Sequence, residues 1–296
     1  MDSNPKTVIL GAGESGTGAA LLAKSRGLEV FVSDHSLIKE KYKNELIQNG
    51  IRFEEGGHNI SLLKNTVEII KSPGIPDSVP LIRKANEKGI PVISEIEFAS
   101  RYTNATKICV TGSNGKTTTT SLLWHMMHTA GLNAGLAGNI GNSFARQVAG
   151  QENDIYALEL SSFQLDGMSS FRADTAILLN ITPDHLDRYE NDLMKYAASK
   201  MRIIRNQTAD NAFIWCSDDE VSSEMIRKIP LNQQVFRISL HDQGHEGAFI
   251  EDNKIIFNIK GETFSMTIEE LALQGKHNIY NSMAAGVAAK LVGIRK

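Results

Sequence analysis

The chain has 296 residues, of which 41% are hydrophobic and 22% are charged, and its formal net charge is −3. This composition is typical of a globular protein with a sizeable core, and the length favours two domains. The near-neutral charge gives no support for binding to nucleic acid or to a membrane surface through bulk electrostatics.

The cysteines, the N-terminus and the length of the apolar runs indicate the compartment in which the protein is expected. Cys109 and Cys216 are too few and too far apart for a disulfide framework or a structural zinc site, so both are expected to be buried hydrophobic residues. The polar N-terminus lacks a secretory apolar region, and no apolar run approaches the roughly 20 residues that span a bilayer. We therefore expect a cytoplasmic protein.

The first hundred residues alternate apolar runs with helix-compatible segments. Strands are expected at 7–10, 29–33, 67–71 and 91–93, and helices at 19–24 and 80–88. The order strand, glycine-rich turn, helix, strand forms a βαβ unit, which implies a parallel sheet. The polar, non-periodic stretch 101–106 predicts a boundary between domains at 1–104 and 105–296.

The same alternation continues in the second part of the chain. Strands are expected at 107–110, 155–160 and 176–180, helices at 117–130, 192–205 and 279–291, and a hairpin at 248–266. Asp252-Asn253 is the expected turn of that hairpin. The predicted fold class is therefore α/β throughout.

A first glycine-rich turn follows the first strand. Gly11, Gly13 and Gly16 match G-x-G-x-x-G between a strand and a helix, and Asp34 ends the next strand. Such a turn allows close approach of the backbone to phosphate and directs a helix N-terminus at an anion. Alone, the pattern is compatible with a dinucleotide cofactor, with another nucleotide, or with a turn needed only for packing.

A second glycine-rich turn follows the strand at 107–110. In the run 111–118, Val110 stands where a strict P-loop has glycine, so the motif is a shortened variant. Its backbone N–H groups can hold phosphates, Lys116 can neutralise their charge, and the Thr117 hydroxyl can bind Mg²⁺. The alternative is a solvated loop with a chance Gly-Lys-Thr. A ligase that binds a nucleotide-tagged substrate and consumes ATP needs both turns.

Three further residues carry potential chemistry. Glu159 lies in an apolar strand, where a carboxylate is costly unless it is paired or binds a metal, although it could also sit at the strand's solvated end. His185 lies between two acids after a strand, and such a histidine is otherwise often structural; Asp187-Arg188 could form a local ion pair. By pattern alone, Lys200 is an exposed lysine beside an apolar stripe.

Taken together, the run 112–118, the Glu-Leu-Ser-Ser-Phe-Gln-Leu run at 159–165, the run 180–189 and Gly-Lys-His-Asn-Ile-Tyr-Asn at 275–281 resemble the Mur ligase family, most closely its D-glutamate-adding branch. The resemblance implies a Rossmann-like N-terminal domain and a central P-loop ATPase-like domain. It also implies a C-terminal Rossmann-like domain of roughly 150 residues that this chain lacks.

The resemblance also implies site residues. The positions matching the family's contacts to the UDP-linked substrate are Gly13, Ser15, Asp34, His35, Ser72, Pro73, Gly74, Asn139 and Ser161. Those matching ATP contacts are Gly112, Ser113, Asn114, Gly115, Lys116, Thr117, Thr118 and, near adenine, Asn278. Thr117, Glu159, His185 and Lys200 match ligands of two Mg²⁺ ions, with Lys200 carried as a carbamate, and Lys116, Glu159, His185 and Lys200 match catalytic positions.

The implied reaction joins D-glutamate to UDP-N-acetylmuramoyl-L-alanine through an acyl phosphate formed from ATP. Because the D-glutamate site belongs to the missing domain, the chain, expected to be a monomer, should bind the UDP substrate without completing the ligation. The alternatives are another Mur ligase adding a different amino acid, a nucleotide-binding module without catalysis, and an NAD-dependent oxidoreductase.

Overall fold

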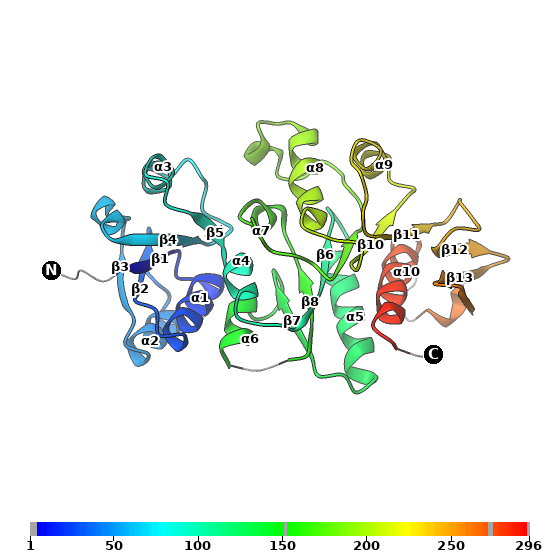
Figure 1. Ribbon diagram of the computed structural model, residues 1–296, viewed down its shortest axis with the longest axis horizontal. Coiled ribbons are helices and arrows are strands. Elements are labelled where there is room, and N and C mark those ends of the chain that lie inside the picture. The colour runs from blue at the N-terminus through cyan, green and yellow to red at the C-terminus, as the bar shows by residue number, and fades with distance from the viewer. Residues whose placement is uncertain (1–4, 151–152, 272–274, 295–296) are drawn as a thin grey trace. The chain divides into compact units, whose positions relative to one another are not determined.

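The computed structural model describes residues 5–150, 153–271 and 275–294 (Figure 1). The chain forms two compact units. The first comprises Met1–Asn104, Gly141–Glu152 and Phe163–Phe171, and the second comprises Ala105–Ile140, Asn153–Ser162 and Arg172–Lys296. Two short segments from beyond position 140 therefore pack with the N-terminal residues, a long-range grouping that local sequence patterns do not reveal.

The first unit contains a five-stranded parallel sheet in the order β3-β2-β1-β4-β5. Its strands are β1 (Lys6–Leu10), β2 (Val30–Asp34), β3 (Arg52–Glu55), β4 (Thr66–Lys71) and β5 (Val92–Ser94). Its helices are α1 (Glu14–Ser25), α2 (Glu40–Gln48), α3 (Pro80–Glu87), α4 (Glu95–Ser100) and α6 (Phe144–Gly150), with a 3-10 turn at Ile60–Leu63. Apolar residues such as Val8, Leu10 and Ile69 are fully buried because both faces of a parallel sheet are covered.

The predicted elements of this unit are confirmed, with shifted ends. The first helix begins at Glu14, directly after the glycine turn, rather than at residue 19. The short elements α2, β3 and α4 were not predicted.

The second unit contains a nine-stranded sheet in the order β14-β13-β12-β11-β10-β9-β6-β8-β7. Its strands are β6 (Thr106–Thr111), β7 (Ala134–Gly138), β8 (Ile155–Glu159), β9 (Thr175–Leu178), β10 (Ala212–Cys216), β11 (Gln234–Ser239), β12 (Gly247–Glu251), β13 (Lys254–Ile259) and β14 (Glu262–Thr267). The strands from β7 to β12 are parallel, and the last two pair antiparallel.

The helices of the second unit alternate with strands of this sheet along most of the chain. They are α5 (Lys116–Thr129), α8 (Leu193–Met201), α9 (Glu220–Ile226) and α10 (Lys276–Leu291), with 3-10 turns at Leu186–Tyr189, Arg202–Ile204 and Ile268–Glu270; α7 (Ser162–Asp166) begins in this unit. A buried apolar cluster joins α5 and α10 to the sheet, and both cysteines are buried, as predicted.

Two predictions in this unit are corrected. The helix expected at 192–205 is α-helical only to Met201 and continues as a 3-10 turn. The hairpin expected at 248–266 is a three-stranded meander, because a second turn at Lys260-Gly261 repeats the positive φ angles found at Asp252-Asn253.

Both sheets have a point where the strand order reverses. In the first, β1 lies between β2 and β4, and in the second, β6 lies between β8 and β9. Ligands of open α/β sheets bind beside the carboxyl ends of the strands at such a point. The two glycine turns directly follow β1 and β6, the strands at these reversal points, so the topology places both turns at ligand-binding edges.

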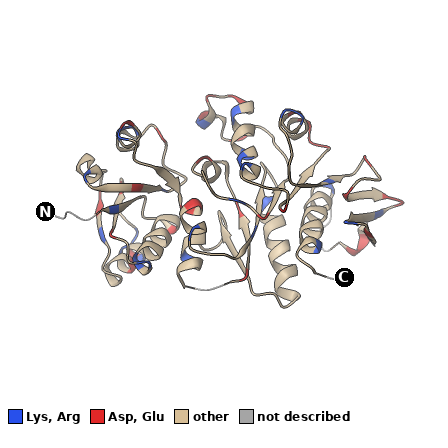
Figure 2. Ribbon diagram, in the orientation of Figure 1, with Lys and Arg blue, Asp and Glu red and all other residues tan. Residues whose placement is uncertain are grey.

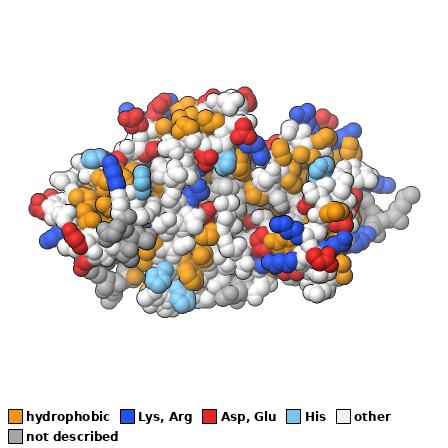
Figure 3. Space-filling view, turned by 180° about the vertical axis from the view of Figure 1, so that it is seen from behind, with side chains coloured by type: hydrophobic (Ala, Val, Ile, Leu, Met, Phe, Trp, Pro, Cys, Tyr) orange, Lys and Arg blue, Asp and Glu red, His pale blue; other side chains and the backbone are white. Residues whose placement is uncertain are grey.

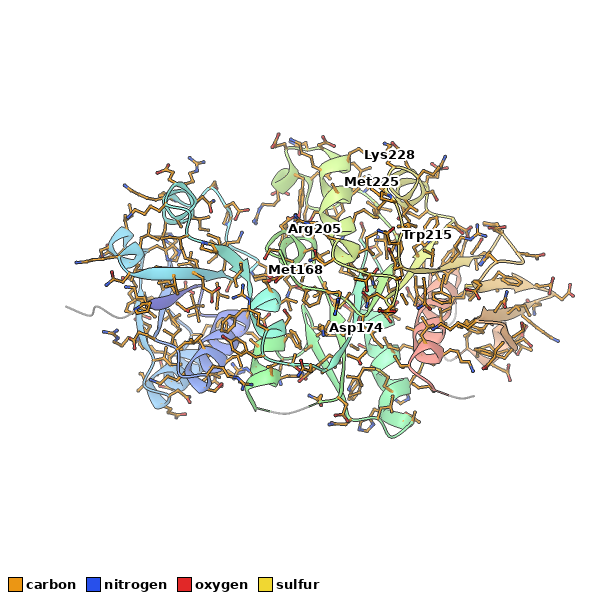
Figure 4. The ribbon with its side chains drawn as sticks, in the orientation of Figure 1. Met168, Asp174, Arg205, Trp215, Met225 and Lys228 are labelled. Carbon is orange, nitrogen blue, oxygen red and sulfur yellow. The ribbon has the colours of Figure 1, made fainter. Side chains whose placement is uncertain are left out.

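Asp174, labelled in Figure 4, lies at the amino ends of β9 and β6, opposite the sheet edge that carries the second glycine turn. This residue precedes β9, and its carboxylate accepts a hydrogen bond from the backbone N–H of Lys107 at 2.8 Å and lies 3.3 Å from that lysine's Nζ. The contact fixes the amino end of β9 against β6. The carboxyl ends of the two strands remain available for the site.

Surface chemistry is mixed. Basic and acidic residues are interspersed along the ribbon (Figure 2), and the face in Figure 3 has hydrophobic side chains in separate groups among polar ones. In the part of the chain that the structure describes, no helix combines the length and hydrophobicity needed to cross a bilayer.

Candidate functional site

The glycine turn of the first unit is shaped by close packing on one side and open space on the other. A Cβ atom on Gly16 would lie 1.7 Å from the carbonyl oxygen of Gly11, so only glycine fits there. A Cβ on Gly13 would meet nothing within 4 Å. Gly13 is also the N-cap of α1 and has no side chain to cap it. The first N–H groups of α1 therefore remain available to an anion.

The acidic residue at the end of β2 fixes this turn. Asp34 Oδ2 accepts a hydrogen bond from the backbone N–H of Ala12 at 2.6 Å, and Oδ1 accepts one from Ser36 at 2.8 Å. His35 follows, with its ring 6.1 Å from that of His58. Asp34 thus holds the loop in addition to any role toward a ligand.

The residues after β4 reach the same edge of the sheet. The backbone N–H of Ser72 donates to Leu10 at 2.9 Å, and the Ser72 hydroxyl is buried without a hydrogen-bond partner among the described residues. Pro73 and Gly74 follow it. Ser15 lies in the first turn of α1. The structure therefore gathers the predicted UDP-contact residues of the first unit at the carboxyl ends of β1, β2 and β4.

The second glycine turn, Gly112–Gly115, connects β6 to α5. Gly115 has a φ of 84°, a left-handed conformation that favours glycine, and it is the N-cap of α5. The loop is held by the segment after β9. The Ser113 N–H donates to the Asn180 carbonyl and the Asn114 N–H donates to Asn180 Oδ1, both at 2.9 Å. Thr118 lies one turn into the helix.

The side chain of Lys116, the first residue of α5, bends back over the loop Gly112–Gly115. Lys116 Nζ donates to the carbonyls of Gly112 at 2.9 Å and Ser113 at 2.8 Å. Burial lowers the pKa of Lys116, although the carboxylates of Glu159 and Asp184 oppose the shift. The cation therefore lies above the turn where a phosphate would be bound.

Glu159 ends β8 and is 2% exposed, which excludes the solvated strand end considered from the sequence. Its Oε2 accepts a hydrogen bond from the Thr117 hydroxyl at 2.7 Å, and its Oε1 accepts one from the Asn139 side-chain amide at 2.8 Å. Three predicted site residues from different segments thus form one polar group beside the loop. We call Thr117, Glu159 and Asn139 the carboxylate group.

Lys200 is not the exposed lysine that its pattern predicts. It is 1% exposed, its Nζ donates to the Gly112 carbonyl at 2.8 Å, and its ammonium lies 4.5 Å from the centre of the Tyr196 ring. Helical periodicity located the apolar stripe of α8 but not the glycine loop that packs on Lys200. The prediction from pattern was therefore wrong, and the lysine contacts the second glycine turn.

The remaining predicted residues are less closely grouped. The His185 side chain is 59% exposed and lies 3.6 Å from Asp184. Ser161 follows β8, and Asn278 on α10 accepts a hydrogen bond from Asn281 at 3.2 Å. Among the described residues, no cluster of three or more His, Cys, Asp or Glu side chains could hold a metal ion. The structure thus does not bring His185 into the carboxylate group.

Four residues at this edge were given no role in the sequence analysis: Asn180 and Asn281, which belong to runs identified there, and Asp218 and Asp219, which do not. Asn180 holds the glycine loop, and Asn281 packs against it, since a Cβ on Gly115 would lie 2.4 Å from Asn281 Oδ1. Asp218 and Asp219 follow β10, and Asp219 Oδ2 accepts from the backbone N–H of Ile181 at 3.2 Å. The sequence signal for Asp218 and Asp219 was a pair of acids shortly after the apolar run 212–216. That run was not predicted as a strand, so the two acids were not placed at the end of one.

The oxygen atoms of the carboxylate group suit Mg²⁺. This ion prefers a hydroxyl or carboxylate from the protein together with phosphate oxygens and water, rather than a cage built only of protein ligands. Thr117 Oγ1 and Glu159 Oε2 are adjacent oxygen atoms beside a phosphate-binding loop. The residues present therefore fit one Mg²⁺ ion bound together with a nucleotide.

One parallel sheet and one mostly parallel sheet, each with a glycine loop ahead of a helix at its switch point, define an α/β nucleotide-binding protein with a P-loop-type second unit. Comparison with known proteins agrees. Residues 110–289 match the Mur ligase middle domain, and residues 5–94 match the Mur ligase MurD-like N-terminal domain. The chain belongs to the Mur ligase family.

Two curated relatives that the chain resembles over nearly its whole length share one protein name. Proteins of Bacteroides fragilis and Bacteroides thetaiotaomicron, each named UDP-N-acetylmuramoylalanine--D-glutamate ligase, are 52% and 54% identical over 291 residues, 98% of this chain. The chain spans 65% of the length of these relatives.

Solved structures show the same fold at low identity. A Neisseria meningitides UDP-N-acetylmuramate:L-alanyl-gamma-D-glutamyl-meso-diaminopimelate ligase has a TM-score of 0.67 at 21% identity, covering 99% of this chain and 95% of that one. UDP-N-acetylmuramate-alanine ligase from Thermotoga maritima has a TM-score of 0.58 at 20% identity, covering 98% and 65%.

Proposed function

We propose that this chain is the UDP-substrate-binding and ATP-binding part of an ATP-dependent ligase that joins D-glutamate to UDP-N-acetylmuramoyl-L-alanine in cytoplasmic peptidoglycan precursor synthesis. The observation that carries the proposal is the carboxylate group next to Lys116. It combines an oxygen pair that suits Mg²⁺ with a cation and a helix N-terminus that suit phosphate.

The first unit would bind the UDP portion of the substrate. The uncapped N-terminus of α1, the open side of Gly13 and the unpartnered Ser72 hydroxyl offer hydrogen-bond donors at one sheet edge. A diphosphate provides the acceptors that these groups lack. Asp34 and His35 lie beside them, at the end of β2, where a ribose or base would be reached.

The second unit would bind ATP. The N–H groups of the loop 112–115 would hold the phosphates, and Lys116 would exchange its two carbonyl contacts for phosphate oxygens. The substrate carboxylate would attack the γ-phosphorus, which forms an acyl phosphate and releases ADP. The amine of D-glutamate would then attack the acyl carbon and lose a proton as phosphate leaves. Asn139 and Ser161, beside Glu159, would contact the acyl end of the substrate.

Thr117 and Glu159 would hold Mg²⁺, which offsets the phosphate charge during transfer. In the family-based proposal His185 and Lys200 contribute to a second ion. For that role the Lys200 ammonium would first lose a proton, and the neutral Nζ would then attack CO₂ and release a second proton, which leaves a carbamate anion with two oxygens. Lys200 Nζ lies 2.8 Å from the Gly112 carbonyl, and this proximity to the proposed phosphate-binding loop supports the assignment.

The names of the relatives, at about half identity over nearly the whole chain, support D-glutamate as the amino acid added. Asn278 would lie near adenine, and the protein would act as a monomer. The alternatives within the same fold are a ligase for another amino acid, a nucleotide-binding module without catalysis, and an NAD-dependent oxidoreductase.

A thermal shift series separates these functions. UDP and MgATP should each raise the Tm, since each binds only the folded state, while NAD should not. Lys116→Ala should abolish the MgATP shift and keep the UDP shift, because the two loops belong to separate units. Stabilisation by NAD without stabilisation by UDP would contradict the proposal.

A further inference from the structure

Asp218, two residues after β10, accepts hydrogen bonds from the end of β11 and from α10. Its Oδ1 accepts from the Ser239 hydroxyl at 2.6 Å, and its Oδ2 accepts from the Leu240 N–H and the Tyr280 hydroxyl, both at 2.7 Å. Burial would raise the pKa of Asp218, but the hydrogen bonds from Ser239, Tyr280 and Leu240 outweigh it and lower the pKa. Asp218 is therefore a stable acceptor at neutral pH.

Tyr280 brings α10 to this acceptor. Burial, and then the hydrogen bond to Asp218, raise the pKa of Tyr280 above its usual value, so the hydroxyl stays a donor. Tyr280 lies in the second turn of α10, whose N-cap, Gly275, provides no side-chain hydrogen bond. The side chain of Tyr280 thus supplies a connection between the start of this helix and the carboxyl end of β10.

The same part of α10 reaches the second glycine turn. Asn281, the next residue, has its Oδ1 against Gly115, and its Nδ2 donates to Asn278 Oδ1 at 3.2 Å. Tyr280 and Asn281 point to different neighbours because they are 100° apart on the helix. One turn of α10 is therefore fixed by Asp218 on one side and lies against the glycine loop on the other.

We propose that Asp218 and Tyr280 are positioning residues for the nucleotide site: their hydrogen bond sets α10 so that Asn278 and Asn281 stand at the correct distance from the glycine loop. The proposal rests on the proposed ATP site, and it assigns to both residues a role that needs no contact with the nucleotide. Loss of the bond lets the first turns of α10 move away from Gly115. Nucleotide affinity then falls without loss of the fold.

The test compares Tyr280→Phe with Tyr102→Phe, a tyrosine in the first unit that packs on Phe98. The binding of the non-hydrolysable MgAMP-PNP is measured by calorimetry, and hydrogen exchange is measured for residues 278–281, whose amides lie beyond the unbonded first N–H groups of α10. Tyr280→Phe should weaken binding about tenfold and speed exchange of these amides by at least about threefold, because a hydrogen bond to a charged group contributes that much to an equilibrium. Tyr102→Phe should change neither.

A double-mutant cycle with Asp218→Asn tests whether the two residues act as a pair. If they do, Tyr280→Phe should have little further effect in the Asp218→Asn background. Unchanged nucleotide affinity in Tyr280→Phe, with or without faster exchange, would overturn the positioning role. Failure of wild type and Tyr102→Phe to bind MgAMP-PNP would instead overturn the proposed ATP site. Unchanged exchange in Tyr280→Phe would still show that the hydrogen bond between Tyr280 and Asp218 does not hold the start of α10.

Discussion

Replacing Glu95 with glutamine should make the first unit less sensitive to alkaline pH. Glu95 is 2% exposed at the start of α4. One of its oxygens accepts a hydrogen bond from the Ala145 N–H, and the other is buried without a partner among the described residues. Burial raises the pKa of Glu95 to about 8; the hydrogen bond from the Ala145 N–H opposes this shift, and the charge of Glu14 adds a smaller contribution that raises the pKa further. Glutamine has the shape of the protonated acid but cannot ionise.

The size and sign of the effect follow from linkage. In the unfolded chain this carboxyl titrates near 4.5, and in the folded protein it titrates near 8. Between these values the folded state holds one more proton, so stability falls as pH rises. The difference of 3.5 pH units at about 1.36 kcal/mol per unit is on the order of 5 kcal/mol. The window from pH 5 to pH 8 contains most of this difference, so the free energy of unfolding of Glu95→Gln relative to wild type should rise across it by about 3 to 4 kcal/mol.

The assay must measure the stability of the first unit. Both tryptophans, Trp124 and Trp215, belong to the second unit, so tryptophan fluorescence would miss the effect. Native-state hydrogen exchange of β1 and β4 amides reports the opening free energy of the first unit directly. Equal pH dependence of wild type and Glu95→Gln between pH 5 and pH 8 would refute the reasoning.

Glu97, two residues further along α4, is the matched control. Burial would raise its pKa, but hydrogen bonds from Ser170, Phe171 and Ser169 lower it below its usual value. Its contribution is therefore present above pH 4.5 and lost as the pH falls through its lowered pKa. Glu97→Gln should destabilise the first unit at pH 7 by about 2 kcal/mol, the opposite sign to Glu95→Gln.

Three further outcomes are expected. Gly16→Ala should lower the free energy of unfolding by about 2 kcal/mol or more, since its Cβ would clash with Gly11, whereas Gly13→Ala should be tolerated; a urea titration of both tests this. Thr117→Val should weaken MgATP binding about tenfold in calorimetry and leave binding in EDTA unchanged, because only the magnesium oxygen is lost. Incubation with ¹³C-bicarbonate should give a carbamate NMR signal that Lys200→Gln lacks, and its absence from wild type would contradict carbamylation.

The sequence predicted most of what depends on local patterns. Apolar runs followed by Gly11 or Gly112 identified β1 and β6, the strands at the reversal point of each sheet, and the loop after each, because these residues must satisfy local backbone geometry. The three-strand meander was underestimated because Lys260, unlike Asn253, is an unusual residue for a left-handed turn.

Contacts between distant segments could not be predicted. The burial of Lys200 depends on Gly112, 88 residues away, and the role of Asp218 depends on Tyr280, 62 residues away. Likewise, the grouping of 141–152 with the first unit depends on the ion pairs of Arg146 with Glu14 and Glu45. Periodicity describes one element at a time, so it contains no information about which loop covers a given helix face.

The central claim is that the two glycine turns bind the phosphates of two different nucleotides. A crystal structure with UDP-N-acetylmuramoyl-L-alanine and MgADP tests it most directly. We expect the UDP diphosphate at Gly13 and Ser15, and the ADP phosphates on the N–H groups of Gly115 and Lys116 with Mg²⁺ at Thr117 and Glu159. Both nucleotides at one turn, or a turn around Gly115 without phosphate, would contradict it.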